Sequence, residues 1–79
     1  MTSYDFILRI ALLDEHQDPA DYLNSLASFD CDDATVGIGA MGFISLDFTR
    51  NAESREAAID LAWRQASQAI PEGRLIQVI

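Results

Sequence analysis

The hydrophobic and polar positions of the chain divide it into strand-like and helix-like segments. Residues 4–13 first alternate and then become apolar on both sides, which predicts a central strand with both faces partly covered. Residues 43–49 alternate cleanly, so that Ile44, Leu46 and Phe48 share one face of a second long strand. Two further strands are predicted at Ala34 to Ile38 and at Arg74 to Ile79.

Two segments have the three-to-four-residue spacing of an amphipathic helix. Asp18 is placed to act as an N-cap and Pro19 occupies the first helical position, so a short helix begins there. Ser54 is placed to cap a second helix, which ends at Pro71-Glu72-Gly73. The expected buried residues are Leu23, Leu26 and Ala27, flanked by Tyr22 and Phe29, in the first helix, and Ile59, Ala62, Trp63, Ala66 and Ile70 in the second.

The predicted order of elements is β-α-β-β-α-β. With right-handed crossovers this order gives an α+β, ferredoxin-like βαββαβ fold, with a four-stranded antiparallel sheet and two helices on one face. The 79 residues form one small domain, 1–79. Because the sequence closes on an apolar strand, we expect it to be the N-terminal part of a longer protein.

A GxGxxG spacing, Gly37, Gly39 and Gly42, matches the loop that holds the pyrophosphate of dinucleotides in larger proteins. That loop must lead from a strand directly into a helix, whereas here it leads into the strand at 43–49. A hairpin turn is therefore the favoured interpretation, with Gly39 and Gly42 allowing positive φ or close strand approach.

Composition narrows the class of function. Thirteen acidic residues, five arginines and no lysine give a net charge of −8, which disfavours binding to nucleic acids and to anionic membranes through this segment. No apolar run is long enough to span a membrane, and the basic start of a secretory signal is missing, so we expect a cytoplasmic protein. The single cysteine, Cys31, excludes an internal disulfide and a cysteine-rich zinc site.

No set of residues identifies a reaction, and we expect no catalytic residues, no cofactor and no metal. Cys31 and the only histidine, His16, are predicted at opposite ends of the first helix, too far apart for a nucleophile and its base. The acidic cluster of Asp30, Asp32 and Asp33 offers oxygen ligands to a hard cation, but it lacks the glycine and the distal glutamate of a calcium loop. A solvated connection is the favoured interpretation, and these three residues form the secondary candidate site.

The main candidate site is the sheet face directed away from the helices. Strand pairing is expected to place Ile7 and Arg9 beside Phe43, Ser45 and Asp47, with an Arg9–Asp47 pair across the strands. A half-apolar sheet face normally requires a cover. We therefore expect self-association or a protein partner at this face.

The run DP-(x)3-LxxL-(x)4-CDDATVGxG, from Asp18 to Gly39, resembles a small bacterial family. LDFTR at 46–50, Ser54 with AAI at 57–59, and AIP at 69–71 extend the resemblance over nearly the whole chain. In that family this acidic segment is an N-terminal module often followed by a helix-turn-helix DNA-binding segment of the regulator, antitoxin or excisionase type. The resemblance implies a non-enzymatic interaction, dimerisation or sensing module of a bacterial regulatory protein.

The alternative is an ACT-like domain that binds a small ligand such as an amino acid. Such domains resemble this chain in element order and bind their ligand at the loop after the first strand, here DEHQDPADYL at 14–23. The family pattern has Pro-Gly where this chain has Pro19-Ala20, so the close backbone approach that glycine allows is missing.

Overall fold

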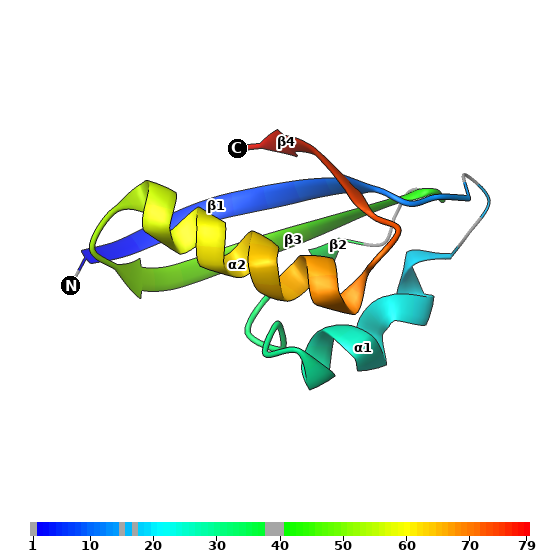
Figure 1. The fold of residues 1–79 in the computed structure, drawn as a ribbon, viewed down its shortest axis with the longest axis horizontal. Helices are drawn as coiled ribbons and strands as arrows, with labels where there is room; N and C mark the ends of the chain where they lie inside the picture. Colours follow the sequence, from blue (N-terminus) through cyan, green and yellow to red (C-terminus); the bar gives the residue numbers. More distant parts are fainter. Residues whose placement is uncertain (1, 15, 17, 38–40) are drawn as a thin grey trace.

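The computed structural model describes residues 2–14, 16, 18–37 and 41–79. Within these residues it contains four strands, two α-helices and one 3-10 helix (Figure 1). In chain order they are β1 (Thr2–Ala11), η1 (Pro19–Tyr22), α1 (Leu23–Ser28), β2 (Thr35–Gly37), β3 (Phe43–Ala52), α2 (Arg55–Ala69) and β4 (Arg74–Val78). The predicted α+β class, with a four-stranded antiparallel sheet and two helices, is confirmed.

β1 and β3 form the centre of the sheet. The strand order is β2-β3-β1-β4, and each neighbouring pair is antiparallel. The β1–β3 ladder runs from Thr2 opposite Ala52 to Ala11 opposite Phe43, over the full length of both strands. β2 and β4 are shorter, so they cover only parts of the outer edges of this central pair.

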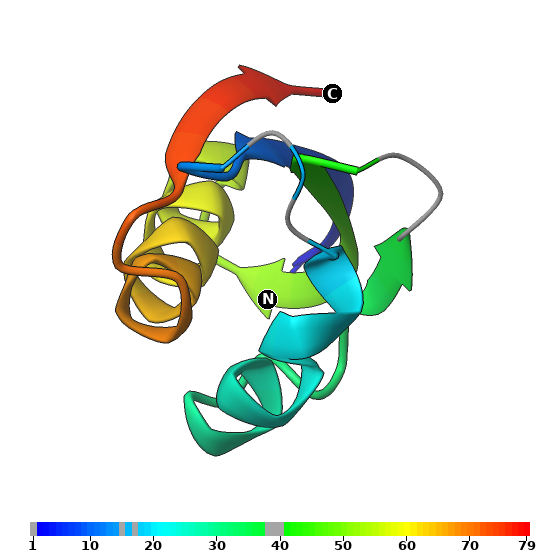
Figure 2. The ribbon, with the colours of Figure 1, turned by 90° about the vertical axis from the view of Figure 1, so that its right-hand side faces the viewer.

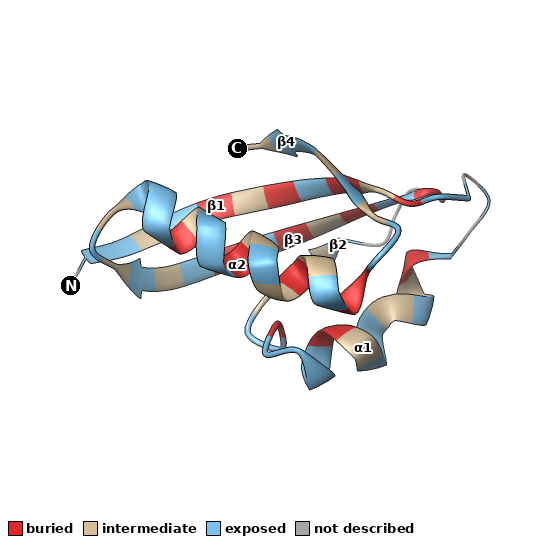
Figure 3. Cartoon of the chain, in the orientation of Figure 1, coloured by how far each residue is buried: buried red, intermediate tan, exposed pale blue. Residues whose placement is uncertain are grey.

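The core lies on one side of the central strands. Burial alternates along both of them, and the even-numbered residues are the buried ones (Figure 3). Phe6 stacks on Phe48 with ring centroids 5.5 Å apart, which joins the two strands inside the core. The central strand predicted at residues 4–13 is therefore confirmed, although it spans Thr2–Ala11. Its second face is partly covered as expected, since Ile7 and Ala11 are half-buried and Arg9 is exposed.

α2 packs on the sheet through small residues. Ser54 caps it as predicted, because its side chain accepts a hydrogen bond from the Ala57 N–H at 3.1 Å. Ala62, Ala66 and Ile70 are buried as predicted, whereas Ile59 and Trp63 are only half-buried and pack at the edge of the core. Alanine methyls let the helix axis approach the strands closely, and the two large side chains lie at the flank. The buried residues of α2 are Ala58, Ala62, Ala66 and Ala69.

The first helical segment buries less than its sequence predicts. Asp18 caps it by accepting from the Ala20 N–H at 3.0 Å, but the first turn is the 3-10 helix η1. Of the five residues expected to face the core, only Leu26 is fully buried, and Leu23 is exposed. Figure 2 shows the sheet curving around α1 and α2, which contact each other.

The glycine motif connects two antiparallel strands, as the hairpin interpretation requires. Gly37 ends β2 opposite Ser45, and β3 begins directly after Gly42. Gly42 has φ 81°, a left-handed conformation that glycine adopts without a steric cost. Gly39 lies outside the described residues. No helix of the described chain is long and apolar enough to cross a membrane.

Candidate functional site

The structure brings the five predicted surface residues together on one side of the sheet, called here the open sheet face. In the β1–β3 register Ile7 lies opposite Asp47, and Arg9 lies opposite Ser45. Phe43 lies opposite Ala11, and 43% of its surface is exposed. All five alternate with core residues on their strands, so they are directed away from the helices.

The predicted ion pair between Arg9 and Asp47 is not formed. The Arg9 Nη1 instead donates to the Gln77 Oε1 at 3.3 Å, on the neighbouring strand β4. Asp47 lies two positions further along the ladder, opposite Ile7, and makes no ion pair with the described residues.

β4 adds residues to the open sheet face that the sequence did not predict. A register irregularity between Arg9 and Ile10 pairs these two residues with Gln77 and Leu75, and so leaves Ile76 as an extra residue. After this bulge the backbone of Ile79 exchanges two hydrogen bonds with Ile7, at 3.0 and 2.9 Å. Ile79 therefore extends the apolar part of the face beside Ile7, with 54% of its surface exposed.

The charges of the open sheet face are balanced. Its described charged residues are Asp5 and Asp47 against Arg9 and Arg74, which lies opposite Ala11. The whole chain carries −8, so the excess negative charge lies elsewhere on the molecule. A hollow of about 420 Å³ beside Ile79 contains the acidic part of this face, where Thr49 Oγ1 donates to Asp5 Oδ1 at 2.6 Å.

Arg50 organises the acidic loop that the sequence offered as a secondary candidate. Its guanidinium binds both carboxylate oxygens of Asp33 at 3.0 Å, and it donates to the Asp30 carbonyl and to Gln65 of α2. The same guanidinium lies 4.5 Å from the centre of the Phe48 ring. Asp33 and the Asp30 carbonyl therefore join the loop to β3 and α2.

Asp32 makes no hydrogen bond or ion pair with Arg50 and is exposed. No group of three or more acidic, cysteine or histidine side chains suited to a metal ion occurs among the described residues. Asp30 has φ 64°, which gives the chain the turn that brings its carbonyl to Arg50. The sequence does not reveal this arrangement because Arg50 lies 17 positions from Asp33, with a strand between them.

Cys31 is part of the core. Its side chain is 1% exposed, and its Sγ lies 3.7 Å from the Phe29 carbonyl. Burial raises the pKa of the Cys31 thiol, and the neighbouring aspartates act in the same direction against Arg50. His16 is exposed in the loop after β1, where its backbone N–H donates to Asp14. Because Cys31 is buried and His16 lies in the exposed loop after β1, the thiol is best interpreted as a structural part of the core.

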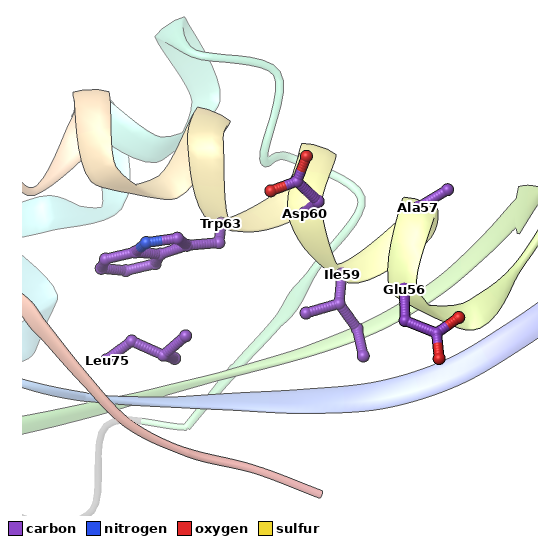
Figure 4. A pocket seen from close by; sticks show the side chains of 6 residues that line it. All are labelled: Glu56, Ala57, Ile59, Asp60, Trp63 and Leu75. Atoms are coloured by element: carbon purple, nitrogen blue, oxygen red, sulfur yellow. The ribbon is translucent and has the colours of Figure 1, made fainter.

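A groove between α2 and β4 was not predicted. It holds about 510 Å³, and its apolar lining is formed by Ile59, Trp63 and Leu75 (Figure 4). In the figure the Trp63 indole lies above Leu75, and Ile59 is directed toward the strands. Glu56 and Asp60 stand at its rim. Helical spacing predicts that Ile59 and Trp63 face the core. For this reason the sequence does not indicate that they line a surface groove.

Comparisons of the chain with protein-family models, with curated proteins and with solved structures found no match.

Proposed function

We propose that this chain is a non-enzymatic interaction module that self-associates through its open sheet face, within a bacterial regulatory protein. The observation that carries the proposal is the face itself: it is partly apolar, uncovered by either helix and balanced in charge.

The fold that we propose is the ferredoxin-like βαββαβ arrangement. Support comes from the strand order β2-β3-β1-β4, with all neighbours antiparallel and with helical segments between β1 and β2 and between β3 and β4. In this arrangement both helices cover one face of the sheet. The other face is then available for binding.

Apolar surface on the open sheet face supplies a reason to associate. Phe43 and Ile79 are about half exposed, and Ile7 lies directly beside Ile79, whereas Phe43 lies further along the sheet, opposite Ala11. Burying a phenylalanine side chain that was exposed contributes on the order of 1.5–3 kcal/mol. In a two-fold contact the same residues are buried on both copies, so each contributes once per copy.

The balanced charge of the open sheet face makes it the part of the surface where a second copy meets least repulsion. Two molecules of net charge −8 repel each other at most approaches, but the open sheet face has two arginines and two aspartates. In a two-fold contact the Arg9 side chain of one copy can meet the Asp47 carboxylate of the other. Such pairs would replace the cross-strand pair that the monomer does not form.

The regulatory role rests on the resemblance of the CDDATVG segment, Cys31 to Gly37, to a bacterial module that precedes DNA-binding segments. Because this chain is strongly acidic, we assign DNA contact to such a segment and self-association to the present one.

Sedimentation velocity over a wide concentration range tests the proposal. The wild-type chain is expected to dimerise, and Phe43→Ser is expected to weaken the dimer at least about tenfold, because each copy loses buried apolar surface. Phe29→Ser is the matched control, since Phe29 has a similar exposure of 39% but follows α1, away from the open sheet face.

A wild-type chain that stays monomeric at millimolar concentration would contradict self-association. Equal weakening by Phe29→Ser and Phe43→Ser would contradict the assignment to the open sheet face. Thermal unfolding of each variant at low concentration establishes that the monomers are folded.

A further inference from the structure

The open sheet face is apolar at one of its two ends. At the end of the sheet where β1 stops and β3 begins, Phe43 lies opposite Ala11. Leu13 and Met41 lie at the same end, because the ladder continues by one more backbone hydrogen bond beyond this pair. The exposed fractions of Phe43, Met41 and Leu13 are 43%, 54% and 79%. Three large apolar side chains are therefore gathered at this end.

The opposite end of the open sheet face, where β1 begins and β3 stops, is polar. β1 and β3 direct four side chains to this part of the face, and all four are polar and exposed. They are Ser3, Asp5, Thr49 and Asn51. Apolar and polar surface are thus separated along the two central strands, which run side by side (Figure 1).

Two copies can place their open sheet faces against each other about a two-fold axis in two ways. If the axis runs across the strands, the apolar end of each copy covers the polar end of the other. If the axis runs along the strands, between β1 and β3, then β1 of each copy faces β3 of the other and like ends meet. The two arrangements bury the same surface but differ in what each residue contacts.

The charges do not choose clearly between the two arrangements. Arg9 is close to Asp47 of the other copy in both, since the two residues are offset by one strand in the first and by one same-face position in the second. An axis across the strands also brings Arg74 toward Asp5 of the other copy. An exposed ion pair of this kind contributes at most about 1 kcal/mol.

The apolar end favours the axis along the strands. With this axis Phe43 faces Ala11 of the other copy, and burying an exposed phenylalanine against apolar surface contributes on the order of 1.5–3 kcal/mol. With the axis across the strands Phe43 would face Thr49 of the other copy, beside the Asp5 carboxylate. The aromatic ring would then remove water from a charged group without offering it a hydrogen bond.

We propose that the dimer has its two-fold axis along β1 and β3, so that the apolar ends of the two open sheet faces pack on each other. Phe43 of each copy lies against Ala11 of the other, and Leu13 and Met41 of both copies gather around these contacts. This inference rests on the proposed self-association. It adds the orientation of the two copies and assigns Leu13 and Met41 to the interface.

A short bismaleimide crosslinker and single cysteines measure the orientation. Facing sheets lie about 10 Å apart, whereas Asp5 and Ala11 lie about 20 Å apart along β1. With the axis along the strands each residue of β1 lies close to its own equivalent, so Asp5→Cys and Ala11→Cys should each crosslink as homodimers. A mixture of the two variants should give no crosslinked heterodimer. The wild-type chain is the control, because its Cys31 is 1% exposed.

Leu13→Ser tests the apolar end independently of the crosslinks. Sedimentation velocity should show the dimer weakened about three- to tenfold, because apolar surface is lost on both copies. Leu61→Ser is the matched control, since Leu61 is 49% exposed but lies on α2, away from the open sheet face. The Leu61→Ser dimer should dissociate like the wild type.

The opposite crosslinking pattern, a heterodimer from the mixture and no homodimer of either variant, would overturn the axis along the strands and leave the proposed self-association standing. Absence of all crosslinks in a chain that sediments as a dimer would do the same. A Leu13→Ser dimer as tight as the wild type would overturn the packing of the apolar ends. A wild-type chain that stays monomeric would overturn both the orientation and the self-association.

Discussion

At the scale of single residues, the Arg50 side chain connects β3 to the acidic loop and to α2. Its side chain is only 14% exposed, and it binds the carboxylate of Asp33 through two nitrogen atoms. A planar guanidinium can make this bidentate contact while it stacks on Phe48, and an ammonium group cannot do both. We infer that the shape of the side chain matters here as well as its charge.

Arg50→Lys tests this inference. The free energy of unfolding is expected to fall by about 1–2 kcal/mol, because hydrogen bonds to Asp33 and Gln65 are lost although the charge remains. We expect no larger loss of unfolding free energy, because the Asp33 side chain is 44% exposed and solvent weakens its ion pair with Arg50. Urea unfolding measures the change.

Arg64→Lys provides the comparison for Arg50→Lys. Arg64 binds Asp60 at 2.7 Å, but both side chains are more than two-thirds exposed, at 69% and 68%. An exposed pair of this kind on a helix contributes about 0.3–0.5 kcal/mol. Equal effects of the two substitutions would show that the loop contact of Arg50 contributes no more than a surface pair.

The buried Cys31 thiol is expected to make the free energy of unfolding depend on pH. Burial raises the pKa of its thiol in the folded chain above the ordinary value of 9.0, so the folded state favours the protonated form. The resulting stabilisation is fully present below pH 9.0 and is lost as the pH rises through and above that value. The wild-type chain should therefore lose more unfolding free energy between about pH 8 and 10 than Cys31→Ala does.

Urea unfolding of both proteins at several pH values measures this difference, and groups that titrate in both cancel in the comparison. If the free energy of unfolding changes with pH in the same way for both proteins, the pKa of the Cys31 thiol is not raised by folding. In the folded protein at neutral pH a thiol reagent is expected to react with Cys31 much more slowly than in urea, since the side chain is 1% exposed.

At the scale of elements, the sequence predicts each helix and strand better than the orientation of its buried face. In the first helical segment the residues that do face the core are Pro19, Tyr22 and Leu26. The step from 19 to 22 follows the three-residue turn of η1, and the step from 22 to 26 follows the α-helical turn. A single helical period cannot describe this change, so Leu23 was wrongly assigned to the core.

In α2 the prediction was right for Ala62 and Ala66 but placed the centre of the buried face too near Ile59 and Trp63. Four alanines form the buried surface of the helix. A helix can lie close to a sheet only where its side chains are small, and this decides which face is turned inward. The displaced large residues form the groove that the sequence did not suggest.

The connection between α2 and β4 requires a glycine. A Cβ atom on Gly73 would lie 2.8 Å from Cγ2 atoms of both Ile10 and Ile70, which are fully buried. Gly73→Ala is therefore expected to lower the unfolding free energy by about 1–3 kcal/mol, measured by thermal or urea unfolding.

Gly37→Ala is the control for Gly73→Ala. Its added Cβ would meet atoms of Ser45 alone, the nearest being the Ser45 Cβ at 3.3 Å, a much looser approach than that at Gly73. An effect within about 0.5 kcal/mol is expected there. Comparable losses for the two variants would mean that Ile10 and Ile70 adjust to the added methyl group.

At the scale of the whole molecule, periodicity and turn residues were enough to predict the class, the number of strands and their antiparallel pairing. The strand alternation at 43–49 correctly separated Ile44, Leu46 and Phe48 from the open sheet face. Which residues of β4 lie on the open sheet face could not be predicted in the same way. Its bulge opposite Arg9 and Ile10 leaves Ile76 unpaired, and nothing in the short segment RLIQVI marks that irregularity.

The distribution of charge over the whole molecule predicts how salt affects the proposed dimer. The open sheet face has no net charge, so the −8 of each chain acts as long-range repulsion between two copies. Raising sodium chloride from about 20 mM to about 500 mM screens this repulsion and should tighten the dimer, as measured by sedimentation velocity.

Neutralising two acids outside the face should imitate part of this effect of salt. Asp21→Asn with Asp32→Asn changes the net charge from −8 to −6, so the dimer should be tighter than wild type at low salt and similar at high salt. A dimer that loosens as salt rises would contradict this account, because it would mean that pairs such as Arg9 with Asp47 of the other copy outweigh the repulsion between the two chains.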